Sequence, residues 1–371
     1  MTGAVEQEHS ESGSRRVGVI RVGSLGDHLI ALPIYHQLRE IHRRDALTLI
    51  SNVPAAGNPK LVGPASILPP GLFDQTCAYP ALSGWAGVWA AIRLFRRLQL
   101  DQLYYLMPRR TSRQLRRDRV FFGLSGTHVV GLNAIATDPV RPVARGLYEH
   151  EADRLARAIG LRGGRAERTE GRVSMQLTAL ERAEAARIAG APQDGVLVVS
   201  VGTKCDVKDW GIDKWRALIQ RLSELRSVDR LVLVGSEDEY HASDSLKAAW
   251  RRRADNFCGR LSPRMSAAVM ASAKLFVGHD SGPMHMAAAV GVPIVAIFSS
   301  RSLPGQWFPL TERSRTHYTV IDCMGCGRER CDDLRKACIE RISVDEVFAS
   351  CVAMLPDEMC AAASGVVAIR V

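Results

Sequence analysis

Short runs of aliphatic and β-branched residues alternate along the chain with segments in which apolar residues recur every three or four positions. The runs predict buried strands, and the segments predict amphipathic helices. In the first half the pattern predicts strands at 16–21, 46–51, 102–107 and 127–131, and helices over 29–38, 86–98 and 113–122. Strands that alternate with helices are typical of a parallel sheet, so we expect an α/β fold.

A second alternation of the same kind follows. It predicts strands at 195–201, 230–234, 274–278 and 292–298, and helices at 213–225, 243–253, 283–290 and 344–355. The stretch 160–171 is rich in Gly, Arg and Glu and has no apolar period, so we expect the domain boundary within about twenty residues after it. We therefore expect a disordered tail at 1–15, domains at 16–180 and 190–350, and a C-terminal tail at 351–371 with a short apolar end at 366–371.

Composition and charge narrow the class of protein. The chain has 371 residues, of which 46% are apolar and 24% charged, an ordinary globular mixture. Its net charge of +10 favours anionic partners. The most apolar window, 287–298, is too short to span a membrane, and residues 1–14 do not resemble a secretory signal. We expect a soluble cytoplasmic protein whose nine cysteines are thiols or metal ligands rather than disulfides.

The loop Gly23-Ser24-Leu25-Gly26-Asp27 ends the first predicted strand. Two glycines and an aspartate do not match the dinucleotide fingerprint GxGxxG, so a nicotinamide site is disfavoured. Asp27 has two interpretations from spacing alone: it caps the following helix, or it presents a carboxylate at the edge of the sheet.

Three further loops carry candidate chemistry, and each follows a strand of the second half. Residues 278–285 combine Asp280 and Ser281 with the start of a helix, whose free amides favour an anion such as a diphosphate. Residues 202–210 carry a threonine and two of the chain's seven lysines, which suit phosphate. Glu237 follows the strand at 230–234 and suits ribose hydroxyls. The alternatives for the first two loops are an ordinary capped helix and solvated lysines, and the Glu237 motif by itself is a weak signal.

These four loops resemble those of the glycosyltransferase family nine heptosyltransferases. The matching segments are IRVGSLGDHLIALPIYHQL, GTKCDVKDWGIDKW, LVLVGSEDE and VGHDSGPMHMAAAVGVPIVAIF. The resemblance implies the GT-B fold, in which two Rossmann-like domains with parallel sheets face each other across a cleft. The acceptor would lie on the first domain and the nucleotide-sugar donor on the second.

The resemblance also implies roles for single residues. Asp27 matches the general base and Lys208 the residue that stabilises the departing diphosphate. The expected donor-binding residues are Thr203, Lys204, Glu237, Asp280, Ser281, Gly282, Met284 and His285, and the expected acceptor-binding residues are Gly26, Arg109 and Arg113. His279 is a departure, because family members often carry asparagine there. The six arginines of 109–119 face an anionic acceptor or a membrane in one interpretation, and only solvent in the other.

Four cysteines cluster near the end of the second domain, at Cys323, Cys326, Cys331 and Cys338. Thiolates at this spacing favour a structural zinc or iron ion, and free thiols in a surface loop are the alternative. Catalysis is expected to need no cofactor, since the chain has no DxD triplet to hold a divalent ion.

The sequence thus predicts an inverting, metal-independent transferase that moves a sugar, most simply heptose from ADP-heptose, onto an anionic glycan or glycolipid of the lipopolysaccharide type. It would work in the cytoplasm with peripheral contact to the inner membrane and without nucleic acid. The alternatives are a nucleotide-sugar epimerase of the GT-B type and a non-catalytic nucleotide-sugar binding protein.

Overall fold

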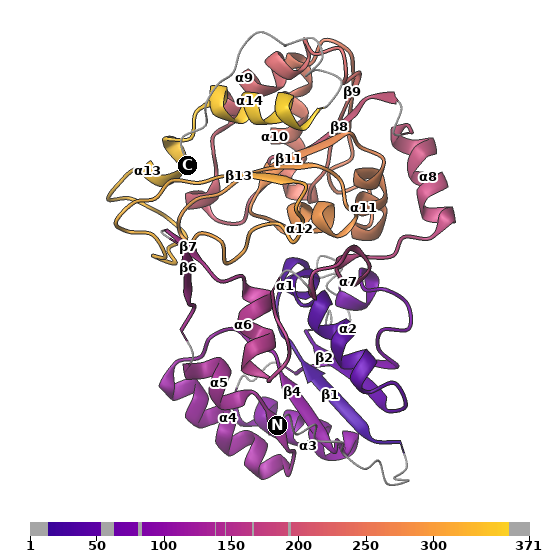
Figure 1. The fold of residues 1–371 in the computed structure, drawn as a ribbon, viewed down its shortest axis with the longest axis vertical. Helices are drawn as coiled ribbons and strands as arrows, with labels where there is room; N and C mark the ends of the chain where they lie inside the picture. Colours follow the sequence, from indigo (N-terminus) through magenta and orange to yellow (C-terminus); the bar gives the residue numbers. More distant parts are fainter. Residues whose placement is uncertain are drawn as a thin grey trace, which may run out of the picture.

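The computed structural model describes residues 14–52, 63–80, 84–137, 139–144, 146–164, 167–191 and 194–355. These residues form two α/β domains, one below the other in Figure 1. Of the tails expected at 1–15 and 351–371, residues 1–13 and 356–371 lie outside the described residues, and so does the apolar end at 366–371.

The first domain is built on a five-stranded sheet whose paired strands are all parallel. Its order is β3 (Gln75–Ala78), β2 (Ala46–Ser51), β1 (Arg16–Ile20), β4 (Gln102–Tyr105) and β5 (Val129–Val130). The direction of the crossovers changes between β1 and β4. Such a point in an open parallel sheet is where ligands bind, at the carboxyl ends of the strands.

Helices connect these strands and cover both faces of the sheet (Figure 1). They are α1 (Leu25–Ile30), α2 (Leu32–Ile41), α3 (Gly84–Leu98), α4 (Ser112–Ser125), α5 (Leu132–Thr137), α6 (Glu151–Ala158) and the short α7 (Glu170–Val173), with a 3₁₀ turn at Pro64–Ser66. The predicted first helix is divided at Ala31, because Pro33 in the first turn of α2 has no N–H to donate. A hairpin of β6 (Pro142–Ala144) and β7 (Leu147–Tyr148) precedes α6.

The second domain has a six-stranded parallel sheet. Its order is β10 (Arg253–Asn256), β9 (Arg230–Leu233), β8 (Val196–Ser200), β11 (Leu275–His279), β12 (Ile294–Ile297) and β13 (Ser314–His317). Strands β8, β9, β11 and β12 are buried along their whole length, which explains why their sequences read as continuous apolar runs.

The helices of this domain are α8 (Ala179–Ala189), α9 (Ile212–Leu222), α10 (Tyr240–Ser245), α11 (Pro263–Ala271), α12 (Gly282–Ala289), α13 (Ala337–Glu340) and α14 (Val344–Met354). The prediction of one helix over 243–253 is wrong. The chain leaves α10 at Ser245, makes a 3₁₀ turn at Lys247–Ala249 and enters β10 at Arg253. Leu246 and Trp250 are buried in the second core, and the pairing of β10 with β9 continues the sheet.

Two expected boundaries also change. Helix α8 packs against α11, so the second domain begins near Ala179 rather than at residue 190. Cys351, which was expected in the C-terminal tail, is fully buried within α14 and belongs to the core of the second domain.

The domains meet through a small apolar cluster and through backbone hydrogen bonds. Ile30, Ala152 and Val173 of the first domain pack with Leu310 of the second. On the β7 side, Tyr148 N donates to Pro304 O at 2.9 Å and Glu151 N donates to Gln306 O at 2.9 Å. This contact fixes how the carboxyl edges of the two sheets face each other. In the part of the chain that the structure describes, no helix is long and apolar enough to cross a bilayer.

Candidate active site

Helix α1 of the first domain and helix α12 of the second lie directly against each other (Figure 1). Each follows a central strand of its own sheet, β1 and β11. Gly26 faces His285: a Cβ on Gly26 would come within 2.8 Å of His285 Cδ2. A larger residue than glycine would therefore push the two helices apart. The expected acceptor and donor loops thus lie side by side.

Asp27 is held by the loop that precedes it. Its Oδ2 accepts hydrogen bonds from Ser24 N at 2.7 Å and Ser24 Oγ at 2.8 Å, which completes a capping box. Its Oδ1 lies 3.3 Å from Nη2 of Arg21. Arg21 is buried and also donates to the backbone oxygens of Asp27 and Leu106. The capping interpretation of Asp27 is therefore correct, and its side chain is in addition one-fifth exposed.

The charge of Asp27 is set by competing effects. Burial raises the pKa of this carboxyl, but Arg21 and the hydrogen bonds from Ser24 outweigh burial and lower it below its ordinary value of 3.8. Its neighbour His28 is fully buried between Tyr35 and Ser51, and burial lowers the pKa of His28 to about 3. At neutral pH this site holds a carboxylate beside a neutral imidazole.

Lys208, Asp280 and His285 form the opposing group on the second domain. Lys208 Nζ lies 2.7 Å from Asp280 Oδ2 and donates to Asp280 O at 3.1 Å. Asp280 Oδ1 lies 3.9 Å from His285 Nε2. Burial lowers the pKa of His285, although Asp280 and Asp27 both raise it. Because an ammonium has three N–H groups and two are engaged here, one remains for a ligand.

The first turn of α12 adds backbone donors beside this group. Ser281 is the N-cap, its hydroxyl donates to His279 O at 3.3 Å, and Gly282 has no atom within 4 Å of where a Cβ would stand. An anion can therefore approach the amides closely. Met284, expected to bind donor, is fully buried in the apolar core instead.

The remaining donor residues lie at the ends of β8 and β9. Thr203 Oγ1 is engaged in its own turn, accepting from Cys205 N at 3.3 Å, and Lys204 and Glu237 are exposed. The carboxylate that reaches the β8 loop is Glu239, since a Cβ on Gly202 would lie 1.8 Å from its Cδ. Burial raises the pKa of Glu239 against the opposing effects of Ser236 and Lys204. Its only sequence signal was the capping-box spacing from Ser236.

The segment that carries the Lys208 group matches a known protein family. Residues 163–336 match the model of glycosyltransferase family 9 (heptosyltransferase). Residues 163–336 are a glycosyltransferase family 9 domain. The family and the enzyme class expected from the sequence are therefore confirmed for this domain. A search of curated protein sequences finds no match.

Solved structures agree on the fold beyond the family 9 domain. A family 9 glycosyl transferase from Veillonella parvula is 15% identical, with a TM-score of 0.68 over 94% of this chain and 100% of that one. The ADP-heptose lps heptosyltransferase II of E. coli is 17% identical, with a TM-score of 0.65 over 92% and 99%. The iron-containing dodecameric glycosyltransferase TibC of enterotoxigenic E. coli is 15% identical, with a TM-score of 0.57 over 94% and 78%. The predicted α/β fold of the GT-B type is confirmed.

The arginines expected to bind acceptor do not join the Asp27 group. Arg109 follows β4 and Arg113 lies in the first turn of α4, and both are exposed. Among the described residues, the side chains that contact the Asp27 carboxylate are those of Ser24 and Arg21. Arg21 ends the first predicted strand and was not singled out, because its burial under Asp27 depends on the return of β4 beside β1.

The four clustered cysteines do not form a preformed metal site. In the described ranges no three His, Cys, Asp or Glu side chains are placed to hold a metal ion, and these thiols are free. Cys326 is exposed in a loop whose Gly325 and Gly327 have positive φ, whereas Cys338 is buried in α13. Burial raises the pKa of Cys338 and the other three thiols raise it further, which places all four in one neighbourhood.

The cysteine loop, residues 323–338, touches the segment that carries Lys208. Val207 N donates to Glu329 O at 3.1 Å. Lys336 Nζ donates to Asp209 O at 3.3 Å and lies 3.7 Å from Asp206 Oδ1. The loop therefore supports the 3₁₀ turn Asp206–Lys208 from outside.

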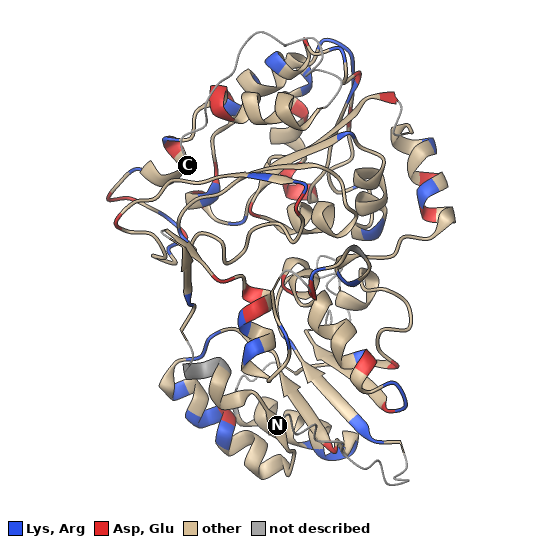
Figure 2. Ribbon diagram, in the orientation of Figure 1, with Lys and Arg blue, Asp and Glu red and all other residues tan. Residues whose placement is uncertain are grey.

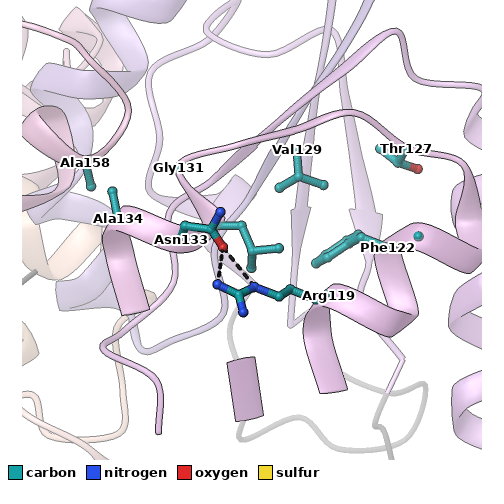
Figure 3. A pocket seen from close by; sticks show the side chains of 10 residues that line it. Arg119, Phe122, Thr127, Val129, Gly131, Asn133, Ala134 and Ala158 are labelled. Atoms are coloured by element: carbon teal, nitrogen blue, oxygen red, sulfur yellow. Dashed lines mark hydrogen bonds between the residues drawn. The ribbon is translucent and has the colours of Figure 1, made fainter. Parts of the chain in front are cut away.

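A hollow of about 500 Å³ lies away from these groups, on the outer side of the first domain. Figure 3 shows it between α4, the edge strand β5 and α5, with Arg119 donating both Nε and Nη2 to Asn133 Oδ1 at 2.9 and 2.8 Å. Phe122, Val129 and Leu132 form the apolar part of its wall, and Arg119, Thr127 and Asn133 the polar part. None of the residues expected to be catalytic lines it.

His279 couples the two donor loops, and this coupling predicts a pH dependence of stability. Its Nε2 accepts from Trp210 N at 3.1 Å, and burial lowers its pKa to about 4, with Asp209 opposing. An unfolded histidine titrates near 6.5, so between pH 6.5 and 4 the unfolded chain binds a proton that the folded chain does not. The free energy of unfolding should fall by about 1.4 kcal/mol per pH unit in that window for this residue.

His279→Asn tests this expectation, because asparagine accepts from Trp210 N without titrating. Urea unfolding at pH 7 and pH 5 should show a smaller loss of stability in the variant than in the wild type. Equal losses in both proteins would show that His279 does not carry this dependence.

Proposed function

We propose that the protein is an inverting, metal-independent transferase that moves heptose from ADP-heptose to an anionic glycan or glycolipid of the lipopolysaccharide type. The observation that carries the proposal is the contact of α1 with α12. It brings an ionised carboxylate of one domain beside a lysine and a helix N-terminus of the other. The family 9 match supports the sugar class, and the name of the E. coli relative supports ADP-heptose as donor.

Asp27 serves as the general base in this proposal. The acceptor hydroxyl oxygen attacks the anomeric carbon from the face opposite the diphosphate, and its proton passes to the Asp27 carboxylate. As that bond forms, the bond between the anomeric carbon and the diphosphate oxygen breaks, and ADP leaves. Arg21 and Ser24 keep the carboxylate ionised and aimed.

Lys208 and the first turn of α12 stabilise the leaving diphosphate. The free N–H of Lys208 and the amides near Gly282 supply positive charge where negative charge grows. Asp280 and His285 position the ammonium and the helix rather than react. Glu239 takes the ribose role that the sequence assigned to Glu237, because it is the carboxylate that reaches Gly202.

Titration with nucleotides tests the donor assignment. ADP-heptose and ADP should raise the thermal midpoint, and a ligand at 100 times its dissociation constant adds about 2.7 kcal/mol. UDP-glucose and GDP-mannose serve as controls for the base and the sugar. Binding of a uridine or guanosine nucleotide in preference to ADP would contradict the donor assignment.

We propose further that the cysteine loop takes up one zinc or iron ion and closes around it. The spacing of Cys323, Cys326, Cys331 and Cys338 supports this, and so does their shared neighbourhood. When bound, the metal would tie the loop together and so support Lys208 indirectly, without a part in the chemical step.

Elemental analysis of protein purified without chelator checks the metal. We expect one ion per chain in the wild type and its loss in Cys323→Ser/Cys326→Ser. Cys77→Ser is the matched control, because Cys77 lies in the first domain. Equal and substoichiometric metal in wild type and double variant would leave the cysteines as free thiols.

A further inference from the structure

Helices α3 and α4 lie side by side on one face of the first sheet and share an outer surface (Figure 1). Arg96 Nη2 donates to Leu124 O at 3.0 Å, and Phe95 packs edge-on against Phe121 at 5.4 Å. These contacts hold the two helices in one orientation. Whatever their outward side chains bind therefore meets a single rigid surface.

Large apolar side chains stand out from this surface. On α3, Trp85 is 83% exposed and Trp89, one turn further, is 54% exposed. On α4, Val120 is 63% exposed and Leu124, again one turn further, is 56% exposed. Exposure of a tryptophan side chain to water is unfavourable in free energy. Two exposed tryptophans on one side of a helix therefore indicate a surface that a binding partner covers.

The same surface is strongly cationic. The sequences of α3 and α4 contain seven arginines and one acidic residue. That residue, Asp118, is buried and already engaged by Tyr105 and Arg117. The helix period places Arg93 and Arg96 on the stripe of the tryptophans, and Arg113 and Arg117 on the stripe of Val120 and Leu124. Arg97 and Arg116 lie next to these stripes and are exposed. Figure 2 shows the blue bands along α4.

We propose that this outer surface of α3 and α4 docks on an anionic lipid surface. Tryptophan side chains favour the headgroup region of a bilayer, and arginines bind lipid phosphates from the same plane. A nucleic acid would satisfy the arginines but not four exposed apolar side chains spread over two helices. A second copy of the chain would oppose arginine to arginine across a two-fold axis.

The orientation of this surface fits the proposed transfer to a glycolipid, and this point rests on the proposed function. Helices α3 and α4 begin where β3 and β4 end, at the carboxyl edge of the sheet that also carries Asp27. A first domain lying on a membrane through this surface would keep its acceptor edge close to the headgroups. A membrane-anchored glycolipid acceptor would then reach Asp27 without leaving the bilayer.

Vesicle binding tests the proposal with the full chain and without any sugar substrate. We expect co-sedimentation with vesicles of phosphatidylglycerol and phosphatidylethanolamine, little with phosphatidylcholine alone, and release by high salt. Arg93→Gln/Arg97→Gln/Arg116→Gln should weaken binding on the order of a hundredfold, at roughly fivefold per charge. Arg43→Gln/Arg44→Gln/Arg330→Gln removes the same charge from exposed sites elsewhere and should bind like the wild type.

The tryptophans give a second readout. Vesicles should shift the fluorescence of the wild type to the blue, and Trp85→Ala/Trp89→Ala should lose both the shift and most of the binding. Leu180→Ala, at an equally exposed position of α8, should keep both. Circular dichroism confirms that each variant is folded.

Equal binding to anionic and neutral vesicles would overturn the proposal. Wild-type binding by the arginine triple variant would overturn it too, as would self-association through Trp85 and Trp89 without lipid. Because the vesicles contain no acceptor, these failures leave the transfer reaction standing, and failure of nucleotide binding leaves the docking surface standing.

Discussion

Asp27→Asn should lower kcat by about 10² to 10⁴, the usual contribution of a general base. Asparagine keeps the size of the side chain and can still accept from Ser24, but it cannot take the proton of the acceptor hydroxyl. Since the pKa of Asp27 is lowered below 3.8, the wild-type base should stay ionised from pH 8 down to that value. The pH profile of kcat should accordingly show no acidic limb from Asp27 in the neutral range.

The structural role of Asp27 has to be separated from this effect. The substitution leaves the buried Arg21 without its carboxylate, and breaking a buried ion pair costs about 3 to 5 kcal/mol. Ser24→Ala is the matched control, because it weakens the cap by about 1 kcal/mol and keeps the base. If Ser24→Ala and Asp27→Asn lose the same activity per folded molecule, Asp27 is only a helix cap.

Lys208→Ala should lower kcat on the order of a hundredfold or more while weakening ADP-heptose binding much less. Negative charge on the bridging oxygen grows mainly in the transition state, so the ammonium contributes most there. Steady-state kinetics and calorimetric titration of ADP-heptose separate the two effects.

The control for Lys208 uses another paired lysine. Lys247 pairs with Asp244 at 2.9 Å and is none of the expected donor-binding residues, so Lys247→Ala should leave kcat unchanged. Lys208→Arg, which keeps the charge beside Asp280, should recover part of the activity. A rise in KM with an unchanged kcat for Lys208→Ala would make Lys208 an ordinary binding residue.

The positions of the central strands were predictable because these strands are buried on both faces. β8, β9, β11 and β12 therefore appear as uninterrupted apolar runs. β10 and β13 were missed for the opposite reason: they lie toward the edges of the sheet, and their sequences RADN and SRTH are polar. The end of the helix within 243–253 likewise depends on the pairing of β10 with β9, which the local sequence does not indicate.

The residues of the candidate site were likewise predictable only in part. Asp27, Lys208 and Asp280 follow strand ends and carry local motifs, so spacing and resemblance indicated them. Arg21 and Glu239 were missed because their importance comes from contacts across the fold, with Asp27 on one side and Gly202 on the other. Met284 was overestimated, since a side chain inside a loop motif can point into the core.

Acceptor-dependent transfer is the most direct test of the account. The protein is incubated with ADP-heptose and a lipopolysaccharide inner-core acceptor, ADP release is followed, and the acceptor is examined by mass spectrometry and NMR. We expect ADP release that requires acceptor, a product one heptose heavier with inverted anomeric configuration, and loss of transfer in Asp27→Asn. ADP release at the same rate without acceptor, or transfer with retained configuration, would contradict it.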